Sequence, residues 1–133
     1  MMVLDCSTAI AWALDEDDGE RAAGVIDRLE DGAAIVPAIW PAEVANALIR
    51  AERKGRLVAE LTGDAVAMIE ELPVTIDDEV AVVLHEVLDL ARSTGLTAYD
   101  ASYLELAGRL GLALATLDRR LAAAAEACGV AVL

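Results

Sequence analysis

Short apolar runs alternate with longer segments of helical periodicity along the chain, and this alternation restricts the fold more than any other feature. Strands of a parallel sheet are buried on both faces, so they appear as short apolar runs, and the connecting helices cover those faces. The runs that predict strands lie at residues 2–5, 33–36, 74–76 and 112–116, with a fifth at 130–133. The alternation therefore predicts the α/β class with a mostly parallel sheet of roughly five strands.

The segments between these runs carry apolar residues at helical spacing. Helices are expected over residues 7–14, 19–29, 41–55, 58–71, 78–95, 97–110 and 118–129. Thr97 suits the N-cap of the sixth helix, and Asp77 or Asp78 suits the cap of the fifth. The buried stripe predicted for the third helix consists of Val44, Ala45, Leu48 and Ile49.

At 133 residues the chain has the size of one domain, and we expect a single domain over residues 1–133. No apolar run approaches the roughly 18 residues that span a bilayer, and the start lacks a charged-then-apolar signal. We therefore expect a soluble cytoplasmic protein without membrane contact. Cys6 and Cys128 are expected to be small buried residues with free thiols.

The net charge of −14 limits how this chain can meet a nucleic acid. A surface this acidic repels phosphates at long range, so any nucleic-acid chemistry must use local basic groups and bound cations. The same charge suits a basic partner protein. Aromatic residues make up only 3% of the chain, which argues against a base-stacking platform of the RNA-recognition type.

Four acids lie at the ends of predicted elements: Asp5, Glu43, Asp100 and Asp118. Ligand sites in parallel sheets lie beyond the carboxyl ends of the strands, so these side chains can face one cleft. Simpler interpretations exist for each acid alone. Asp5 and Asp118 can cap helices. Glu43 and Asp100 can be ordinary first-turn acids, which the positive end of the helix dipole stabilises.

Carboxylates that share a site repel one another unless cations neutralise them. Such oxygen-rich clusters suit Mg²⁺ or Mn²⁺. A divalent ion held there can bind phosphate oxygens and activate water, so the cluster predicts metal-assisted phosphodiester hydrolysis. The ion would also let an acidic pocket accept an anionic substrate.

The sequence around the four acids resembles the four motifs of the PIN-domain ribonucleases, and the closest subgroup is the VapC-type toxins of bacterial toxin–antitoxin pairs. The motifs are VLDCS at 3–7, PAEVANAL at 41–48, TAYDASYLELA at 97–107 and ATLDRRL at 115–121. Each motif is weak alone. Their order and spacing, over essentially the whole chain, make the resemblance specific.

The resemblance implies a three-layer α/β/α sandwich and Mg²⁺- or Mn²⁺-dependent endoribonuclease activity that leaves 5′-phosphate and 3′-hydroxyl ends. It also implies an RNA substrate, a homodimer and inhibition by a cognate antitoxin with a basic segment. The implied catalytic and metal-binding acids are Asp5, Glu43, Asp100 and Asp118. Ser7 and Thr116 match the hydroxyl positions that orient the carboxylates. Arg119 directly follows Asp118, so a further acid that some relatives place nearby is missing here.

Several polar residues near these motifs have two interpretations each. Asn46, one turn beyond Glu43, can hydrogen-bond its carboxylate or lie in solvent. A basic group near the end of the third predicted helix can bind phosphates of an RNA backbone, or can complement the dipole at that helix end. It consists of Arg50, Arg53, Lys54 and Arg56. His85, the only histidine, is expected to be a helix-face residue without a catalytic role.

Two rival functions remain open at this point. One is a catalytically silent PIN-like module that acts through protein partners. The other is an aspartyl-phosphate phosphotransferase with Asp5 as nucleophile. That chemistry usually has a second acid two residues after the nucleophile, where this chain has Ser7.

Overall fold

The computed structural model describes the backbone at residues 1–29 and 33–133, and the side chains of residues 80–83 are not described. The strands are β1 (Met2–Leu4), β2 (Ala34–Val36), β3 (Val74–Ile76) and β4 (Leu114–Ala115). The helices are α1 (Cys6–Ala13), α2 (Gly19–Ile26), the 3₁₀ turn η1 (Asp27–Leu29), α3 (Trp40–Arg53), α4 (Ala59–Glu70), α5 (Val80–Thr94), α6 (Ala98–Leu110) and α7 (Arg119–Ala127).

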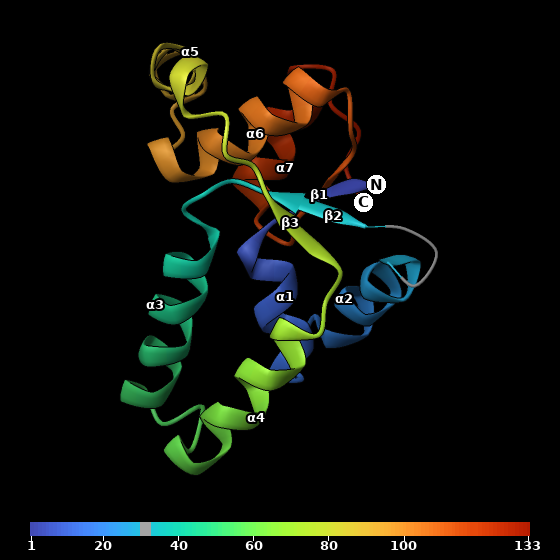
Figure 1. Ribbon diagram of the computed structural model, residues 1–133, viewed down its shortest axis with the longest axis vertical. Coiled ribbons are helices and arrows are strands. Elements are labelled where there is room, and N and C mark those ends of the chain that lie inside the picture. Colours follow the sequence, from blue (N-terminus) through green and yellow to red (C-terminus); the bar gives the residue numbers. More distant parts are fainter. Residues whose placement is uncertain (30–32) are drawn as a thin grey trace.

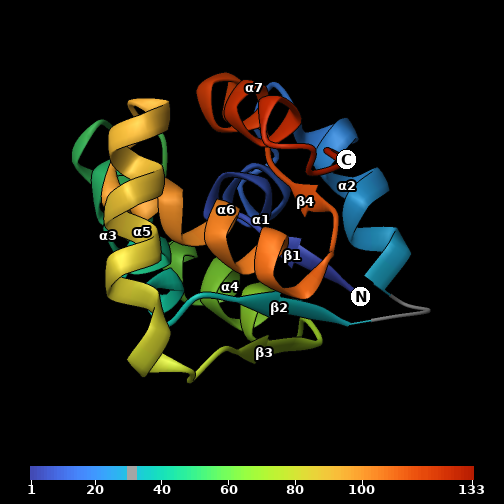
Figure 2. The same cartoon turned by 90° about the horizontal axis from the view of Figure 1, so that it is seen from above.

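The four strands form one parallel sheet in the order β3-β2-β1-β4. Helices α1 to α4 lie on one side of the sheet, and α5, α6 and α7 lie on the other (Figure 1). Seen from above, α6 lies in front of the sheet and α1 and α4 lie behind it (Figure 2). The expected α/β class and three-layer α/β/α arrangement are therefore confirmed.

The sheet has four strands among the described residues, and the fifth predicted strand is reduced to a single pairing. Val132 forms an isolated parallel bridge with Leu114, supported by the N–H of Leu133 donating to the Leu114 carbonyl at 3.0 Å. β4 is also shorter than predicted. The N–H of Leu112 donates to the carbonyl of Ala107 at 3.0 Å, so Leu112 belongs to the turn that ends α6.

The buried face of α3 is rotated from the predicted stripe. Ala45 and Ile49 are exposed, so half of that prediction is wrong. The helix begins at Trp40, whose indole ring is buried and defines the inward face at helical spacing. The residues buried on this face are Trp40, Val44, Leu48 and Ala51.

Two smaller expectations are also corrected. Cys128 is exposed at the end of α7, whereas Cys6 is buried at the start of α1 as expected. Neither Asp77 nor Asp78 caps α5, because Glu79 stands at the N-cap position and makes no side-chain capping bond. Asp77 instead pairs with Arg109.

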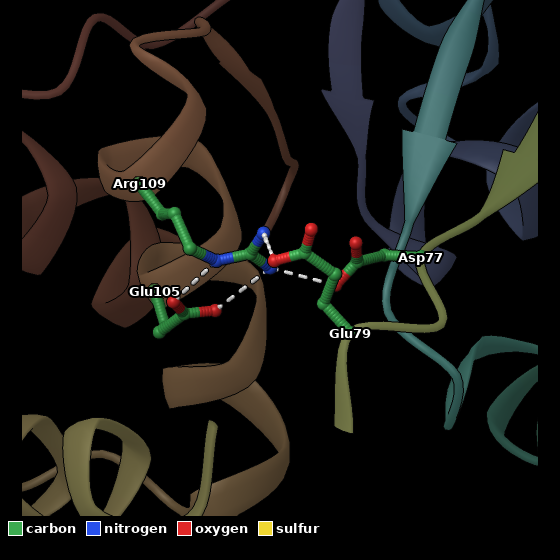
Figure 3. Close-up of polar contacts among 4 residues, drawn as sticks. All are labelled: Asp77, Glu79, Glu105 and Arg109. Carbon is green, nitrogen blue, oxygen red and sulfur yellow. Dashed lines mark hydrogen bonds and ion pairs between the residues drawn. The ribbon is translucent and has the colours of Figure 1, made fainter. Parts of the chain in front are cut away.

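Arg109 joins α6 to the segment between β3 and α5 (Figure 3). Its guanidinium pairs with Asp77 at 2.6 Å, with Glu105 at 2.8 Å and with Glu79 at 3.5 Å. The Glu105 side chain is only 5% exposed, and the Arg109 guanidinium supplies the counter-charge that a buried carboxylate needs. The network holds the edge of the sheet against the helix that carries Asp100.

The strand order places a topological switch beside β1. The chain runs from β1 to β2 to β3 on one side and then returns to β4 on the other side of β1. In open parallel sheets, ligands bind at the carboxyl ends of the strands beside such a switch. Asp5 follows β1 and Thr116 follows β4, so both lie at this position. Within the described part of the chain, no helix combines the length and apolarity needed to cross a bilayer.

Candidate active site

Asp5 is a buried carboxylate at the carboxyl end of the central strand. Its side chain is 6% exposed, and its backbone N–H donates to the carbonyl of Ala115 in the neighbouring strand at 3.0 Å. Oδ2 accepts hydrogen bonds from Ser7 Oγ at 2.5 Å and from Thr116 Oγ1 at 2.7 Å. Asp5 stands at the N-cap position of α1 but makes no capping bond, so capping does not explain this residue.

The two hydroxyls tie Asp5 to the loop that carries Asp118. Ser7 Oγ accepts from the N–H of Leu117 at 3.1 Å, and Thr116 Oγ1 accepts from the N–H of Asp118 at 3.0 Å. Asp118 Oδ1 accepts from the N–H of Leu121 at 2.8 Å, so Asp118 does cap α7, as its simpler interpretation predicted. This capping leaves its other oxygen, Oδ2, available for a ligand.

Glu43 and Asp100 are half-buried acids in the first turns of α3 and α6. Glu43 Oε2 accepts a hydrogen bond from the hydroxyl of Tyr103. Thr97 Oγ1 accepts from the N–H of Asp100 at 3.1 Å, which confirms the predicted N-cap of α6. The helix start thus fixes the backbone from which the Asp100 carboxylate projects.

The four acids influence one another electrostatically. Burial raises the pKa of Asp5, and the charges of Asp100 and Asp118 raise it further against the opposing hydroxyl bonds. Burial likewise raises the pKa of Glu43, with Asp5 and Asp100 adding to the effect. Burial, and then the charge of Asp118, raise the pKa of Asp100, although Arg120 opposes them. The acids therefore share one field of negative charge, which Arg120 offsets in part at Asp100.

The chemistry of this donor set fits a hard divalent cation. Within the described residues, no three His, Cys, Asp or Glu side chains lie close enough together to hold a metal ion directly. Mg²⁺ usually retains several waters and needs only one or two direct carboxylates. Asp5, Glu43, Asp100 and Asp118 are thus the candidate ligands for a hydrated cation, bound directly or through water.

Comparison with known proteins assigns the chain to a family. The family model described as "PIN domain" matches residues 2–127. This chain belongs to the PIN-domain family. The sequence is 34% identical over 125 residues to Ribonuclease VapC3 of Pyrobaculum aerophilum, a match that covers 91% of this chain and 92% of that protein. It is also 34% identical over 128 residues to Ribonuclease VapC3 of Mycobacterium tuberculosis, covering 92% of this chain and 86% of that protein.

Solved structures agree with this assignment. PAE2754 from Pyrobaculum aerophilum superposes with a TM-score of 0.73 at 27% identity and covers 98% of this chain and 87% of its own. FitAcB from Neisseria gonorrhoeae shares the fold, with a TM-score of 0.64 at 23% identity over 100% of this chain and 96% of its own. The resemblance to VapC-type members of the PIN family is confirmed.

Among the described residues of this PIN domain, the basic group, Asn46 and His85 form no hydrogen bond or ion pair with the four acids. Asn46 is exposed, and within the described residues Glu43 is hydrogen-bonded by Tyr103 and not by Asn46. Helix α3 runs away from the sheet (Figure 1), and Arg50 lies two turns beyond Glu43 on this helix, a rise of about 10 Å. The basic side chains at and after the end of this helix are exposed. These residues are Arg50, Arg53 and Lys54. Arg56 instead pairs with Glu16, and His85 is exposed on α5.

A groove of about 730 Å³ extends from the acidic site of the PIN domain along α1. Ser7 and Asp118 line the end nearest the site, and Ile10 and Leu14 contribute an apolar floor. Acids 15–18 and Arg56 line the rest. The groove thus combines an apolar surface with a strongly acidic rim.

Sequence reasoning missed Tyr103. It follows Asp100 by three positions, so both residues project from neighbouring positions on α6. That spacing was a usable signal, but the residue lies within an apolar periodic segment and resembles an ordinary core position. Burial raises the pKa of Tyr103, and its bond to Glu43 raises it further, so the hydroxyl stays protonated and donates.

Proposed function

We propose that this PIN domain is an endoribonuclease that depends on a divalent cation, Mg²⁺ or Mn²⁺, and acts as the toxin of a toxin–antitoxin pair. The observation that carries the proposal is the environment of Asp5. Its carboxylate is buried, is bonded by two hydroxyls and lies in the field of Asp100 and Asp118. No lysine or arginine forms an ion pair with it among the described residues. Such a charge needs a cation.

The residues have separable roles in this proposal. Asp5, held by Ser7 and Thr116 through Oδ2, keeps Oδ1 as the oxygen that would meet the cation. Glu43, Asp100 and Asp118 complete the negative field from three other elements. When bound, a divalent cation supplies charge neutralisation and Lewis acidity for hydrolysis of a phosphodiester. The names of the two VapC3 ribonucleases support RNA as the substrate.

The antitoxin belongs to the same proposal. The acidic groove beside Ser7 and Asp118 has the charge and the apolar floor to receive a basic segment of a partner protein. The overall charge of −14 favours such a partner. A homodimer and a cytoplasmic location complete the proposal. Light scattering of the purified protein tests the dimer, and a monomeric mass would remove it.

The function is tested by RNA cleavage in Mg²⁺ or Mn²⁺, with and without EDTA. Asp100→Asn should abolish cleavage, because it removes one charge from the site. Asp64→Asn, an exposed acid on α4, is the matched control and should cleave normally. Full cleavage by the Asp100→Asn variant would remove this residue from the mechanism.

The two rival functions have their own outcomes in the same assays. A silent binding module would bind no cation in a titration at neutral pH and would cleave no RNA. Turnover of a small phosphomonoester without cleavage of RNA would favour the phosphotransferase.

A further inference from the structure

Tyr103 is a core residue with a polar end. Its side chain is 0% exposed and is among the largest fully buried side chains. A buried hydroxyl costs free energy unless it is hydrogen-bonded, so its partner matters. That partner is Oε2 of Glu43. The ring therefore packs like a core residue, while the hydroxyl reaches one of the four site acids.

This hydrogen bond connects the two helical layers across the carboxyl edge of the sheet. Glu43 belongs to α3 on one side of the sheet, and Tyr103 belongs to α6 on the other (Figure 1). The same helix supplies Asp100 one turn earlier. Helix α6 therefore carries Asp100 itself and, through the Tyr103 hydroxyl, also holds the Glu43 carboxylate of the opposite helical layer.

Glu43 needs such a restraint. It is a half-buried, flexible side chain that faces the negative charges of Asp5 and Asp100. Repulsion from these charges favours rotation of its carboxylate toward solvent. The Tyr103 hydroxyl is the hydrogen-bond donor that opposes this rotation among the described residues.

We propose that Tyr103 is a positioning residue that holds the Glu43 carboxylate at the cation site through its hydroxyl group. The inference rests on the proposed function, because it assumes that the four acids bind a divalent cation. Donation to Oε2 leaves Oε1 of Glu43 available as a ligand. Tyr103 thereby pre-organises an acid that the other acids would repel.

The test is Mn²⁺ affinity measured by electron paramagnetic resonance, together with RNA cleavage. Tyr103→Phe keeps the ring in the core and removes only the hydroxyl. We expect Mn²⁺ to bind about 10- to 100-fold more weakly, the usual effect of losing an outer hydrogen bond to a metal ligand. Tyr99→Phe is the matched control, because it removes an exposed hydroxyl from the same helix, and its Mn²⁺ affinity should equal that of the wild type.

A mutant cycle shows whether Tyr103 acts through Glu43. In a Glu43→Gln background, Tyr103→Phe should weaken Mn²⁺ binding by less than twofold. Glu43→Asp disrupts the same hydrogen bond from the other side and leaves the Tyr103 ring in the core unchanged. It withdraws the carboxylate from the hydroxyl by one methylene and keeps the charge. This variant should also bind Mn²⁺ at least tenfold more weakly.

The outcomes separate this inference from the proposed function. A wild type that binds no Mn²⁺ and cleaves no RNA would refute the proposed function. A wild type that binds Mn²⁺, with unchanged affinity in both Tyr103→Phe and Glu43→Asp, would overturn the role of Tyr103 alone. An equal loss of affinity from Tyr103→Phe with and without Glu43→Gln would also overturn it.

Discussion

Replacement of Arg109 by alanine is expected to destabilise the protein by about 3 kcal/mol. The guanidinium is 21% exposed and pairs with the carboxylates of Glu105 and Asp77, which are 5% and 13% exposed. Removing one partner of a buried ion pair costs roughly 3–5 kcal/mol, because the remaining charge stays buried without a counter-charge. Partial exposure of Arg109 places the expected loss at the lower end of this range.

Urea denaturation at pH 7, followed by far-ultraviolet circular dichroism, measures this loss. A change of this size corresponds to a melting temperature lower by about 10 °C for a domain of this length. Adding Glu105→Gln to Arg109→Ala should restore part of the stability, because it removes one of the two buried carboxylates left without a counter-charge. Glu79→Gln is the control. Its side chain is 67% exposed and lies 3.5 Å from the guanidinium, so its removal should cost less than about 0.5 kcal/mol. A loss below 1 kcal/mol for Arg109→Ala, or an equal loss for Glu79→Gln, would refute this reasoning.

Three further predictions concern the acids. Asp118→Ala should lower stability by about 1 kcal/mol through loss of the α7 cap, whereas Asp118→Asn should keep the cap and weaken Mn²⁺ binding; equal stability of the two variants in urea would contradict this. Thr116→Ala should weaken Mn²⁺ binding about 10-fold by calorimetry, because it removes one of the two hydroxyls that bond Asp5 Oδ2, and unchanged affinity would count against it. The pKa values of Asp5, Glu43 and Asp100 are raised in the fold, so the folded state binds more protons than the unfolded chain. The free energy of unfolding of the metal-free protein should therefore fall as pH rises through the acidic range toward neutrality. In the metal-free protein, Asp100→Asn should therefore increase stability by roughly 0.5–2 kcal/mol at pH 7 and by less at pH 4, and a loss at pH 7 would contradict this.

Much of the fold could be predicted because the local signals agree with the tertiary structure. Thr97 caps α6 as expected, and the strand at residues 74–76 has the predicted bounds. The same local signals placed Asp5 and Asp118 just before helices and Glu43 and Asp100 in first helical turns. The single pairing of Val132 could not be predicted, since strand pairing depends on neighbours that an apolar run does not identify.

The hydroxyl contacts of Asp5 could be predicted from the sequence, whereas the contacts of Tyr103 and Arg109 could not. Ser7 and Thr116 bond Asp5 as their positions suggested. Tyr103 and Glu43 are sixty positions apart, so no local pattern reveals their bond. Arg109 likewise reaches Asp77 across the sheet edge, and this contact removed Asp77 from its predicted role as a helix cap.

Anomalous diffraction from crystals grown with Mn²⁺ tests the central proposal most directly. We predict an anomalous peak among the carboxylates of Asp5, Glu43, Asp100 and Asp118, with at least one of these oxygens at about 2.0–2.3 Å. Saturating Mn²⁺ with no peak at these acids, or with peaks only elsewhere on the surface, would contradict the proposal that this edge of the sheet is a metal-dependent nuclease site.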